Sequence, residues 1–331
     1  MTSILGIGNA LVDALYPEAT DALLAELGLR KGAMQMIDEE TYNKFTARMS
    51  GARRERTTGG AACNTILALA RLGATTTLIG KIAADDNGRF FSESFAAAGV
   101  SLNLITDSGA GSNTGVASAF ITPDGQRTFG TYLGAAATLA AADMRQEWFA
   151  GHAYFYIEGY LVQNHELIDT AVAMARAAGL KVCLDMASFN IVEADRDFFG
   201  HLLRQTDIVF ANEDEARAFT GLPPEEALPA LAAICPTAIV KVGARGAYAR
   251  CGAETAFWPA SPAIKAVDTT AAGDYFAAGF LHASTRGASL EDCLAEATLL
   301  AEEVIQVIGT RLSDAQWARI GEALSDTAGR D

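Results

Sequence analysis

The chain alternates between short apolar runs and longer segments in which apolar residues recur every three or four positions. The short runs end near Gly, Asp or Asn, which is typical of buried strands. They read SILGIG, TTTLIG, AYFYI, KVCLD, DIVFA and AIVKVG. Helical spacing lies between them, over residues 61–72, 87–98, 165–178 and 213–219. This order predicts a parallel sheet covered by helices on both faces, with a ligand beyond the carboxyl ends of the strands.

Two regions do not follow this order. Residues 10–38 and 111–134 are strand-like but half polar, and the second contains a turn, TPDGQ, between GVASAFI and RTFGTYL. We expect them to form a small separate sheet, for instance a lid over the ligand. From residue 271 onward the pattern is mainly helical, over 273–285, 289–308 and 313–325. Without a repeat or a clear linker, the pattern predicts one domain over residues 1–331 with a lid.

Composition and charge narrow the range of partners. Half of the 331 residues are apolar, and the formal net charge is −15. This charge argues against nucleic acid, because phosphate backbones are held mainly by Lys and Arg. The five cysteines are scattered without a CxxC pair, which favours reduced thiols. We expect a cytoplasmic protein with a small-molecule partner and no membrane segment, because no leader and no apolar run of membrane-spanning length is found.

The segment DTTAAGD, residues 268–274, carries the strongest chemical signal. The small residues Ala271, Ala272 and Gly273 precede a helix, so their backbone N–H groups can form an anion cradle at its positive end. No P-loop of the form GxxxxGK[ST] is present. Asp274 either offsets the helix dipole or serves as the base that takes a proton from an alcohol attacking phosphorus.

A second glycine pair, Gly59-Gly60, precedes the helical segment 61–72, with Asn64 in its first turn. Two glycines there allow a ligand to approach the backbone closely, although a glycine turn before a helix is also common in purely structural settings.

The N-terminal segment GIGNALVD contains the start of a dinucleotide fingerprint, Gly6 and Gly8. Leu11 stands where the third glycine or alanine is needed, and no helical pattern follows, so an NAD-dependent oxidoreductase is only an alternative. Asn9 and Asp13 in this segment are either turn residues or groups that recognise the hydroxyls of a polyol.

Three further features have two interpretations each. Asn212 and Glu215 suit a helix capping box or a Mg²⁺ site reached through water. The segment VKVGARGAY suits a plain hairpin or a turn bordering a nucleotide. Its candidate residues are Lys241, Gly243 and Gly246. Arg127 is one of few cations near these regions.

Together these segments resemble the ribokinase-like (pfkB) carbohydrate kinase family over nearly the whole chain. The family's GG-x-x-x-N signature matches residues 59–64, and its D-T-x-[AG]-[AG]-G-D signature matches residues 268–274, about 200 residues later. The N-x-x-E element matches residues 212–215, and the G-x-x-G nucleotide turn matches residues 243–246. One mild departure is Ala271, where many members have glycine.

The resemblance implies a three-layer α/β/α fold with a central, mostly parallel sheet and a small β-sheet lid. It also implies ATP-dependent phosphorylation of a primary hydroxyl, with ATP and Mg²⁺ as cofactors, and it leaves open a need for a monovalent cation such as K⁺. Asp274 would be the base, and the amides of residues 271–274 the anion hole. The other roles would be as follows: Asn9, Asp13, Gly59, Gly60 and Asn64 would hold the acceptor, Arg127 would reach the phosphates, Asn212 and Glu215 would organise Mg²⁺, and Lys241, Gly243 and Gly246 would border the nucleotide. Asp268 would be structural or lie on the nucleotide side.

Within the family, GIGNALVD is similar to the GNPLLD opening of adenosine kinases, and GGAACNT and IGKIAADDNG are also similar to that branch. The resemblance therefore implies a ribonucleoside such as adenosine as acceptor. A sugar of the ribokinase, fructokinase or 2-keto-3-deoxygluconate kinase type is the alternative. A non-catalytic sugar-binding protein is a further alternative, which Asp274 argues against. A monomer and a homodimer both fit the sequence.

Overall fold

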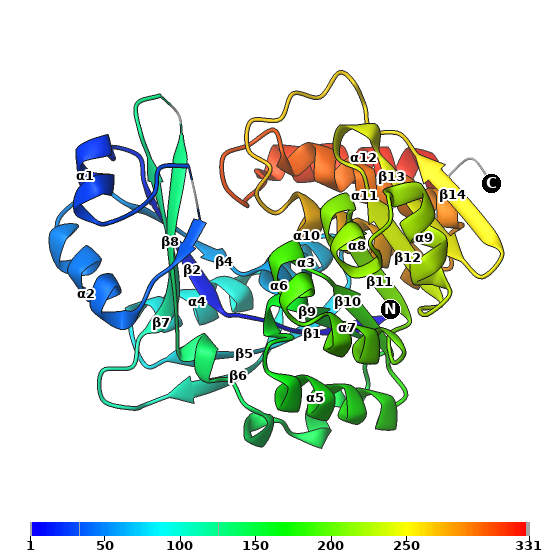
Figure 1. Cartoon of the computed structure of the whole chain (residues 1–331), viewed down its shortest axis with the longest axis horizontal. Helices are drawn as coiled ribbons and strands as arrows, with labels where there is room; N and C mark the ends of the chain where they lie inside the picture. Colours follow the sequence, from blue (N-terminus) through cyan, green and yellow to red (C-terminus); the bar gives the residue numbers. More distant parts are fainter. Residues whose placement is uncertain (1, 33, 125, 329–331) are drawn as a thin grey trace.

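The computed structural model describes residues 2–32, 34–124 and 126–328. In these residues nine strands form one large sheet in the order β14-β13-β12-β11-β10-β9-β1-β5-β6 (Figure 1). Only the edge formed by β12, β13 and β14 is antiparallel. The strands are β1 (Ser3–Ile7), β5 (Thr75–Ala83), β6 (Ser101–Asp107), β9 (Tyr154–Glu158), β10 (Lys181–Asp185), β11 (Ile208–Asn212), β12 (Thr237–Lys241), β13 (Ala247–Cys251) and β14 (Glu254–Trp258).

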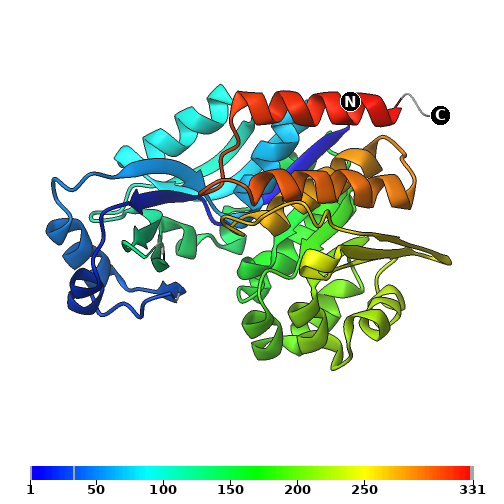
Figure 2. The same cartoon turned by 90° about the horizontal axis from the view of Figure 1, so that it is seen from above.

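Helices cover both faces of this sheet. One face carries α3 (Ala61–Arg71), α4 (Asp86–Ala97), α10 (Ala272–Thr285) and α11 (Leu290–Val304), with α12 (Asp314–Ala328) outside them (Figure 2). The other face carries α5 (His165–Ala177), α6 (Phe189–Ala194), α7 (Arg196–Leu203), α8 (Glu213–Thr220) and α9 (Pro224–Ala232). Short 3₁₀ turns occupy Ala135–Thr138, Ala141–Asp143, Gln146–Phe149, Gly159–Leu161 and Gly243–Arg245.

The alternation of side chains along the central strands explains why both faces are covered. In β9, Tyr154 and Tyr156 belong to the core on the α3 side, whereas Phe155 and Ile157 belong to the core on the α5 side. Successive side chains of a strand point to opposite faces, so an apolar run needs a layer of helices on each. The predicted α/β fold with a large, mostly parallel sheet is therefore confirmed.

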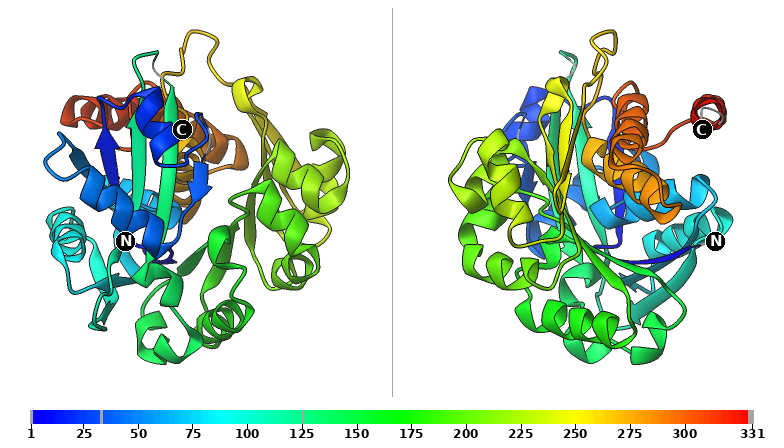
Figure 3. Two further views of the ribbon diagram at one scale, coloured as in Figure 1. Left: turned by 60° about the vertical axis from the view of Figure 1, so that its left-hand side comes forward. Right: turned by 90° about the vertical axis from the view of Figure 1, so that its right-hand side faces the viewer.

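Five other strands form a smaller sheet in the order β3-β8-β7-β2-β4, beside the large one (Figures 1 and 3). They are β2 (Leu11–Tyr16), β3 (Met34–Met36), β4 (Glu55–Gly59), β7 (Thr114–Ile121) and β8 (Arg127–Gly134). Helices α1 (Asp21–Glu26) and α2 (Glu39–Arg48) pack on one face, where Phe120 stacks on Tyr16 and meets Phe45 edge to face. Asp13 alternates with Ala14 and Tyr16 of this face, so it lies on the opposite face.

The small sheet differs from the expected strand-like regions in two ways. Residues 10–38 include a helix, α1, because Thr20 accepts a hydrogen bond from the Leu23 amide and caps it, while Leu24 is buried. Strand β4 lies outside both predicted regions, since it contains the exposed Glu55 and Arg56. The predicted turn over residues 122–126 includes residue 125, which lies outside the described residues.

The cysteines form no disulfide: four thiols are buried and one is exposed. Within the described residues, no helix combines the length and the apolar character needed to cross a lipid bilayer.

Candidate active site

Five neighbouring strands of the large sheet end in polar residues at the same edge. Lys241, Asn212, Asp185 and Glu158 are the last residues of β12, β11, β10 and β9, and Asn9 follows β1 by two residues. The carboxyl ends of parallel strands meet at one edge, and ligands of such sheets bind there. The candidate active site is built on this edge, with the first turn of α10 beside it.

The start of α10 presents free backbone donors. The amides of Ala271, Gly273 and Asp274 have no acceptor among the described residues, whereas the amide of Ala272 donates to the Thr269 carbonyl over 3.2 Å. The cradle thus differs from the expected run of free amides at one position. Ala271 has φ 62°, a left-handed conformation that costs alanine about 1–2 kcal/mol, which explains why glycine suits this position.

A positive charge lies next to this cradle. A Cβ atom on Gly273 would lie 3.1 Å from Nζ of Lys241. The ammonium also donates to Oδ2 of Asp185 over 3.2 Å. Burial lowers the pKa of Lys241, but Asp185 and Glu215 outweigh that effect, and the net pKa lies above its ordinary value. Lys241 is therefore charged at neutral pH and lies where an anion in the cradle would bind.

Asp274, in the first turn of α10, is held by α3. Its Oδ2 accepts a hydrogen bond of 2.9 Å from Nδ2 of Asn64. Burial raises the pKa of Asp274 to about 8; the Asn64 hydrogen bond and Lys241 oppose this, while the nearby Asp185 and Glu158 add to it. A carboxylate with this pKa accepts a proton readily near neutral pH, which suits a general base.

Glu158 is a central residue of the site that the sequence analysis did not identify. Its Oε1 accepts from Nδ2 of Asn9 over 2.5 Å, and its Oε2 accepts from the Ala62 amide over 2.9 Å. Only 1% of Glu158 is exposed, and burial raises the pKa of its carboxyl. Asp185 was missed in the same way. Both acids end an apolar strand, YFYIE or KVCLD, and that position is the signal that would have found them.

The residues expected to hold the acceptor come together around the start of α3. A Cβ on Gly59 would lie 2.1 Å from Oδ1 of Asp13, so glycine lets this carboxylate lie against β4. Gly60 has φ 102°, and a Cβ there would lie 2.1 Å from the Asn9 carbonyl oxygen. Asn9, Asp13 and the glycine pair are thereby brought together, next to the turn of α3 that carries Asn64.

Asn212 and Glu215 form the capping box of α8. The Asn212 amide and Nδ2 each donate to one carboxylate oxygen of Glu215, both over 2.7 Å, and Oδ1 of Asn212 accepts from the Glu215 amide over 2.8 Å. Burial raises the pKa of Glu215 to about 7, with Lys241 lowering it and Asp185 raising it. No group of three or more His, Cys, Asp or Glu in the described residues could hold a metal ion. Because both oxygens of Glu215 already accept hydrogen bonds, the pair fits a metal contact through water rather than direct ligation.

The expected nucleotide turn is the connection between β12 and β13. Gly243 has φ 58° and open space around its missing Cβ, so its backbone is accessible. Gly246 has a structural reason to be glycine, since a Cβ there would lie 2.0 Å from the Trp258 carbonyl oxygen of β14. The hairpin and the open turn are both present.

Two of the predicted site residues, Asp268 and Arg127, are not placed among the others by the structure. Asp268 accepts from the Thr270 amide and hydroxyl and from the Gly309 amide, so it joins the segment before α10 to the loop after α11. Arg127 begins β8 opposite Ile121, but its side chain lies outside the described part of the chain.

The glycines of the alternative dinucleotide fingerprint serve packing. A Cβ on Gly6 would lie 2.6 Å from Cγ1 of Ile66, and one on Gly8 would lie 2.6 Å from Cβ of Ala62. The chain then enters β2 and not a helix, so the strand–turn–helix unit of a dinucleotide site is not formed.

Comparisons with known proteins identify the family. A pfkB family carbohydrate kinase model matches residues 32–317. The structure is similar to a probable sugar kinase from Rhizobium etli CFN 42 (TM-score 0.86) and to an adenosine kinase from Sinorhizobium meliloti (TM-score 0.85). Both are 34% identical and are aligned over 97% of this chain, and over 98% and 99% of their own.

A curated relative is the bifunctional ribokinase/ribose-5-phosphate isomerase A of Fructilactobacillus sanfranciscensis, 29% identical over 226 residues. That match covers 66% of this chain and 40% of the relative. These comparisons and the geometry of the site lead to one conclusion: the chain belongs to the pfkB family of carbohydrate kinases, and it is a phosphotransferase that acts on a sugar or a nucleoside.

Proposed function

We propose that this kinase transfers the γ-phosphate of ATP to a primary hydroxyl of a ribonucleoside of the adenosine type. One observation carries the proposal: Asp274, held by Asn64, lies in the same helical turn as an anion cradle whose charge partner is Lys241. Because the general base and the phosphate site belong to one helical turn, the attacking oxygen and the phosphorus would lie side by side.

In the proposed step, Asp274 accepts the proton of the acceptor hydroxyl, whose oxygen forms a bond to the γ-phosphorus. The bond between that phosphorus and the bridging oxygen breaks, and ADP leaves. The amides of Gly273 and Asp274 and the ammonium of Lys241 stabilise the charge on the transferring group. The base accounts for about 10²–10⁴-fold of the rate, and the charge stabilisation is usually the larger contribution.

Mg²⁺, when bound with ATP, neutralises charge on the phosphates. Asn212 and Glu215 would hold it through water, since their direct contacts are used in the capping box. On the acceptor side, the small sheet would act as a lid: the face that carries Asp13 would close on the acceptor and exclude water.

Two features support a nucleoside as the acceptor: the N-terminal segment and the polar groups that surround the start of α3. Asn9 is fixed by Glu158, and Asp13 lies against Gly59, so an amide and a carboxylate are available to vicinal hydroxyls. The two solved relatives at equal identity are named a sugar kinase and an adenosine kinase. Ribose, fructose and 2-keto-3-deoxygluconate are therefore the alternative acceptors.

The test of the substrate is ADP release with Mg·ATP and adenosine, inosine, ribose, fructose or 2-keto-3-deoxygluconate. We expect the highest kcat/KM with adenosine. A higher value for a free sugar would move the assignment to that sugar. ADP release with none of them would favour a non-catalytic sugar-binding protein. Replacing K⁺ by Na⁺ in the same assay tests the requirement for a monovalent cation.

The test of the base compares two aspartates at the same helical position. Asp274 is the third residue of α10, and Asp292 is the third residue of α11, where it is exposed. If Asp274 only offsets the helix dipole, Asp274→Asn and Asp292→Asn should have similar, small effects. We expect Asp274→Asn to lose at least about 100-fold in kcat while calorimetry shows ATP binding retained. Activity of Asp274→Asn within tenfold of the wild type would refute the base assignment.

A further inference from the structure

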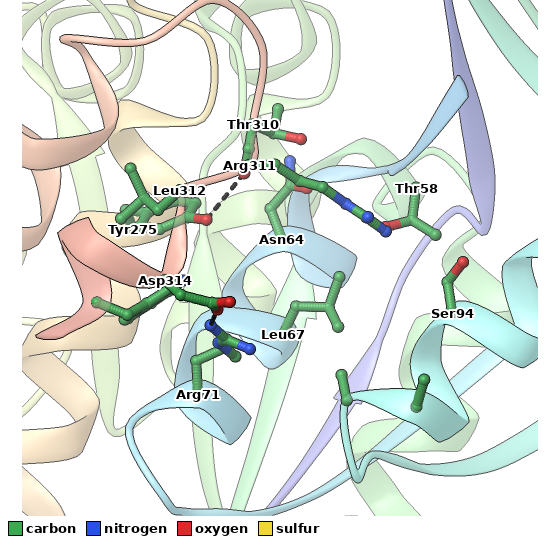
Figure 4. A pocket seen from close by; sticks show the side chains of 13 residues that line it. Thr58, Asn64, Leu67, Arg71, Ser94, Tyr275, Thr310, Arg311, Leu312 and Asp314 are labelled. Atoms are coloured by element: carbon green, nitrogen blue, oxygen red, sulfur yellow. Dashed lines mark hydrogen bonds and ion pairs between the residues drawn. The ribbon is translucent and has the colours of Figure 1, made fainter. Parts of the chain in front are cut away.

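A cavity of about 300 Å³ lies between helices α3, α4 and α12 (Figure 4). Helices α3, α4, α10 and α12, strand β4 and the loop over residues 310–312 line it. Part of the lining is apolar, from Leu67, Ala97, Leu312 and Trp317. Its volume is at the lower end of the range for small-molecule sites, so it suits a molecule of about one ring.

The register of β4 separates this cavity from Asp13, one of the residues expected to hold the acceptor. Asp13 pairs with Thr57, and side chains directly opposite each other share one face of a sheet. Thr58 therefore points to the other face, and it lines the cavity. The cavity and the side chain of Asp13 therefore lie on opposite faces of the small sheet.

The cavity has one arginine whose charge is not neutralised. Arg71 is paired with Asp314 and lies over the ring of Trp317, 5.6 Å from its centroid. Arg311, which also lines the cavity, has no ion pair and no hydrogen bond with any described residue. Asp314, the acid that lines the cavity, is paired with Arg71. In a chain with a formal charge of −15, a guanidinium without an acidic partner of its own favours an anionic ligand.

Thr58 provides a second, independent indication. It is 1% exposed, and its hydroxyl has no hydrogen-bond partner in the described structure. Figure 4 shows Arg311 extending across the cavity toward this hydroxyl. An unsatisfied buried hydroxyl is costly, and a ligand that accepts a hydrogen bond from it removes that cost.

We propose that this cavity binds a small organic anion, whose carboxylate or phosphate head contacts Arg311 and Thr58 and whose apolar ring packs on Leu67 and Trp317. The cavity also borders the candidate base. Asn64, which donates a hydrogen bond to Asp274, lines the cavity. Tyr275, the residue after Asp274, also lines it and donates to the Thr310 carbonyl over 2.8 Å. An anion in the cavity competes for the Asn64 amide and thereby raises the pKa of Asp274. This regulatory step rests on the proposed function, whereas the binding step does not.

Binding is tested by calorimetry at constant ionic strength, with benzoate and phenyl phosphate as probes and benzyl alcohol as the uncharged control. We expect saturable binding of at least one anion and weaker or no binding of the alcohol. Arg311→Gln should weaken that binding about 10- to 100-fold, the range for a lost charge-assisted hydrogen bond. The matched control is Arg319→Gln, which removes an exposed arginine of α12 that does not line the cavity.

A second variant separates binding from folding. Thr58→Val keeps the shape and removes a hydroxyl that bonds to nothing, so thermal unfolding should occur at an unchanged or higher temperature while anion binding weakens. Three results would overturn the site: neither anion binds, Arg311→Gln binds as the wild type does, or Arg319→Gln loses as much as Arg311→Gln. If benzyl alcohol binds as tightly as benzoate, the claim that the ligand carries an anionic head group is refuted.

The coupling is tested separately on the wild type. With the anion bound, the acidic limb of the kcat/KM profile should move to higher pH, and it should not move in Arg311→Gln. An unmoved limb at saturating anion would overturn the coupling while leaving the binding site intact.

Discussion

Replacing Asn64 with alanine removes the hydrogen bond of 2.9 Å that Nδ2 donates to Asp274. A hydrogen bond to a charged group contributes about 1.5–3 kcal/mol, and 1.36 kcal/mol corresponds to one pKa unit. The pKa of Asp274, about 8 in the wild type, should therefore rise further by about one to two. At pH 7 about a tenth of the wild-type molecules carry an ionised Asp274, so Asn64→Ala should lose about 10- to 100-fold in kcat/KM at that pH.

The assay is kcat/KM for the best acceptor from pH 6 to pH 10, with ADP release as the signal. Asn64 is also expected to contact the acceptor, and loss of that contact lowers the whole profile by one factor. The effect on the base moves the acidic limb, so above the new pKa the gap between the curves of wild type and variant should narrow to that one factor. Asn190→Ala, an exposed change on α6, is the control. Parallel curves separated by a constant factor would refute the claim that Asn64 tunes Asp274.

Three further predictions follow from particular contacts. Gly279→Ala should lower the free energy of unfolding in urea by about 1–3 kcal/mol, because its Cβ would lie 2.6 Å from the backbone oxygen of Glu296. The control is Gly321→Ala in α12, where no atom lies near the position of the new Cβ, and it should raise the free energy of unfolding by up to about 1 kcal/mol. Lys241→Met should move the acidic limb of kcat/KM to higher pH, since Lys241 lowers the pKa of Asp274; a limb at unchanged pH would contradict the charge contact. In the native state Asp274 stays protonated from the ordinary pKa of an aspartate up to about pH 8, so this group makes the free energy of unfolding fall as pH rises through that window. Asp274→Asn should therefore gain stability relative to the wild type from pH 5 to pH 8. A difference in stability that is constant over this range would contradict the raised pKa.

The large sheet was predictable because its strands are apolar on both faces. Runs such as KVCLD and TTTLIG correspond to β10 and to the first part of β5, and the predicted helices over 61–72 and 165–178 correspond to α3 and α5. The small sheet was harder, since one of its faces is polar. Strand β4 begins with Glu55 and Arg56, and its place beside β2 is fixed by long-range pairing that no local pattern records.

For the site, the sequence identified residues whose chemistry depends on local context. Asp274 follows the small residues Ala271, Ala272 and Gly273 at the start of a helix, which is a recognisable signal. Glu158 and Asp185 stand at the ends of strands, where an acid is also common at a surface. Their burial and their partners, Asn9 and Lys241, follow from neighbouring strands that are distant in sequence. The raised pKa of Asp274 depends on the same packing, so composition alone could not provide it.

The parallel pairing of β2 with β7 also constrains how the chain folds. Leu11 lies opposite Gly115, so the two partners are separated by more than 100 residues that include α3, β5, α4 and β6. Closing so long a loop is slow, and β2 cannot gain its parallel neighbour on the ribosome until β7 has been synthesised. Until then β2 has only β4 beside it, as a two-stranded ribbon that is marginal in water. The small sheet should therefore be the last part of this half of the chain to become protected from amide hydrogen exchange during refolding, after β1, β5 and β6 have joined.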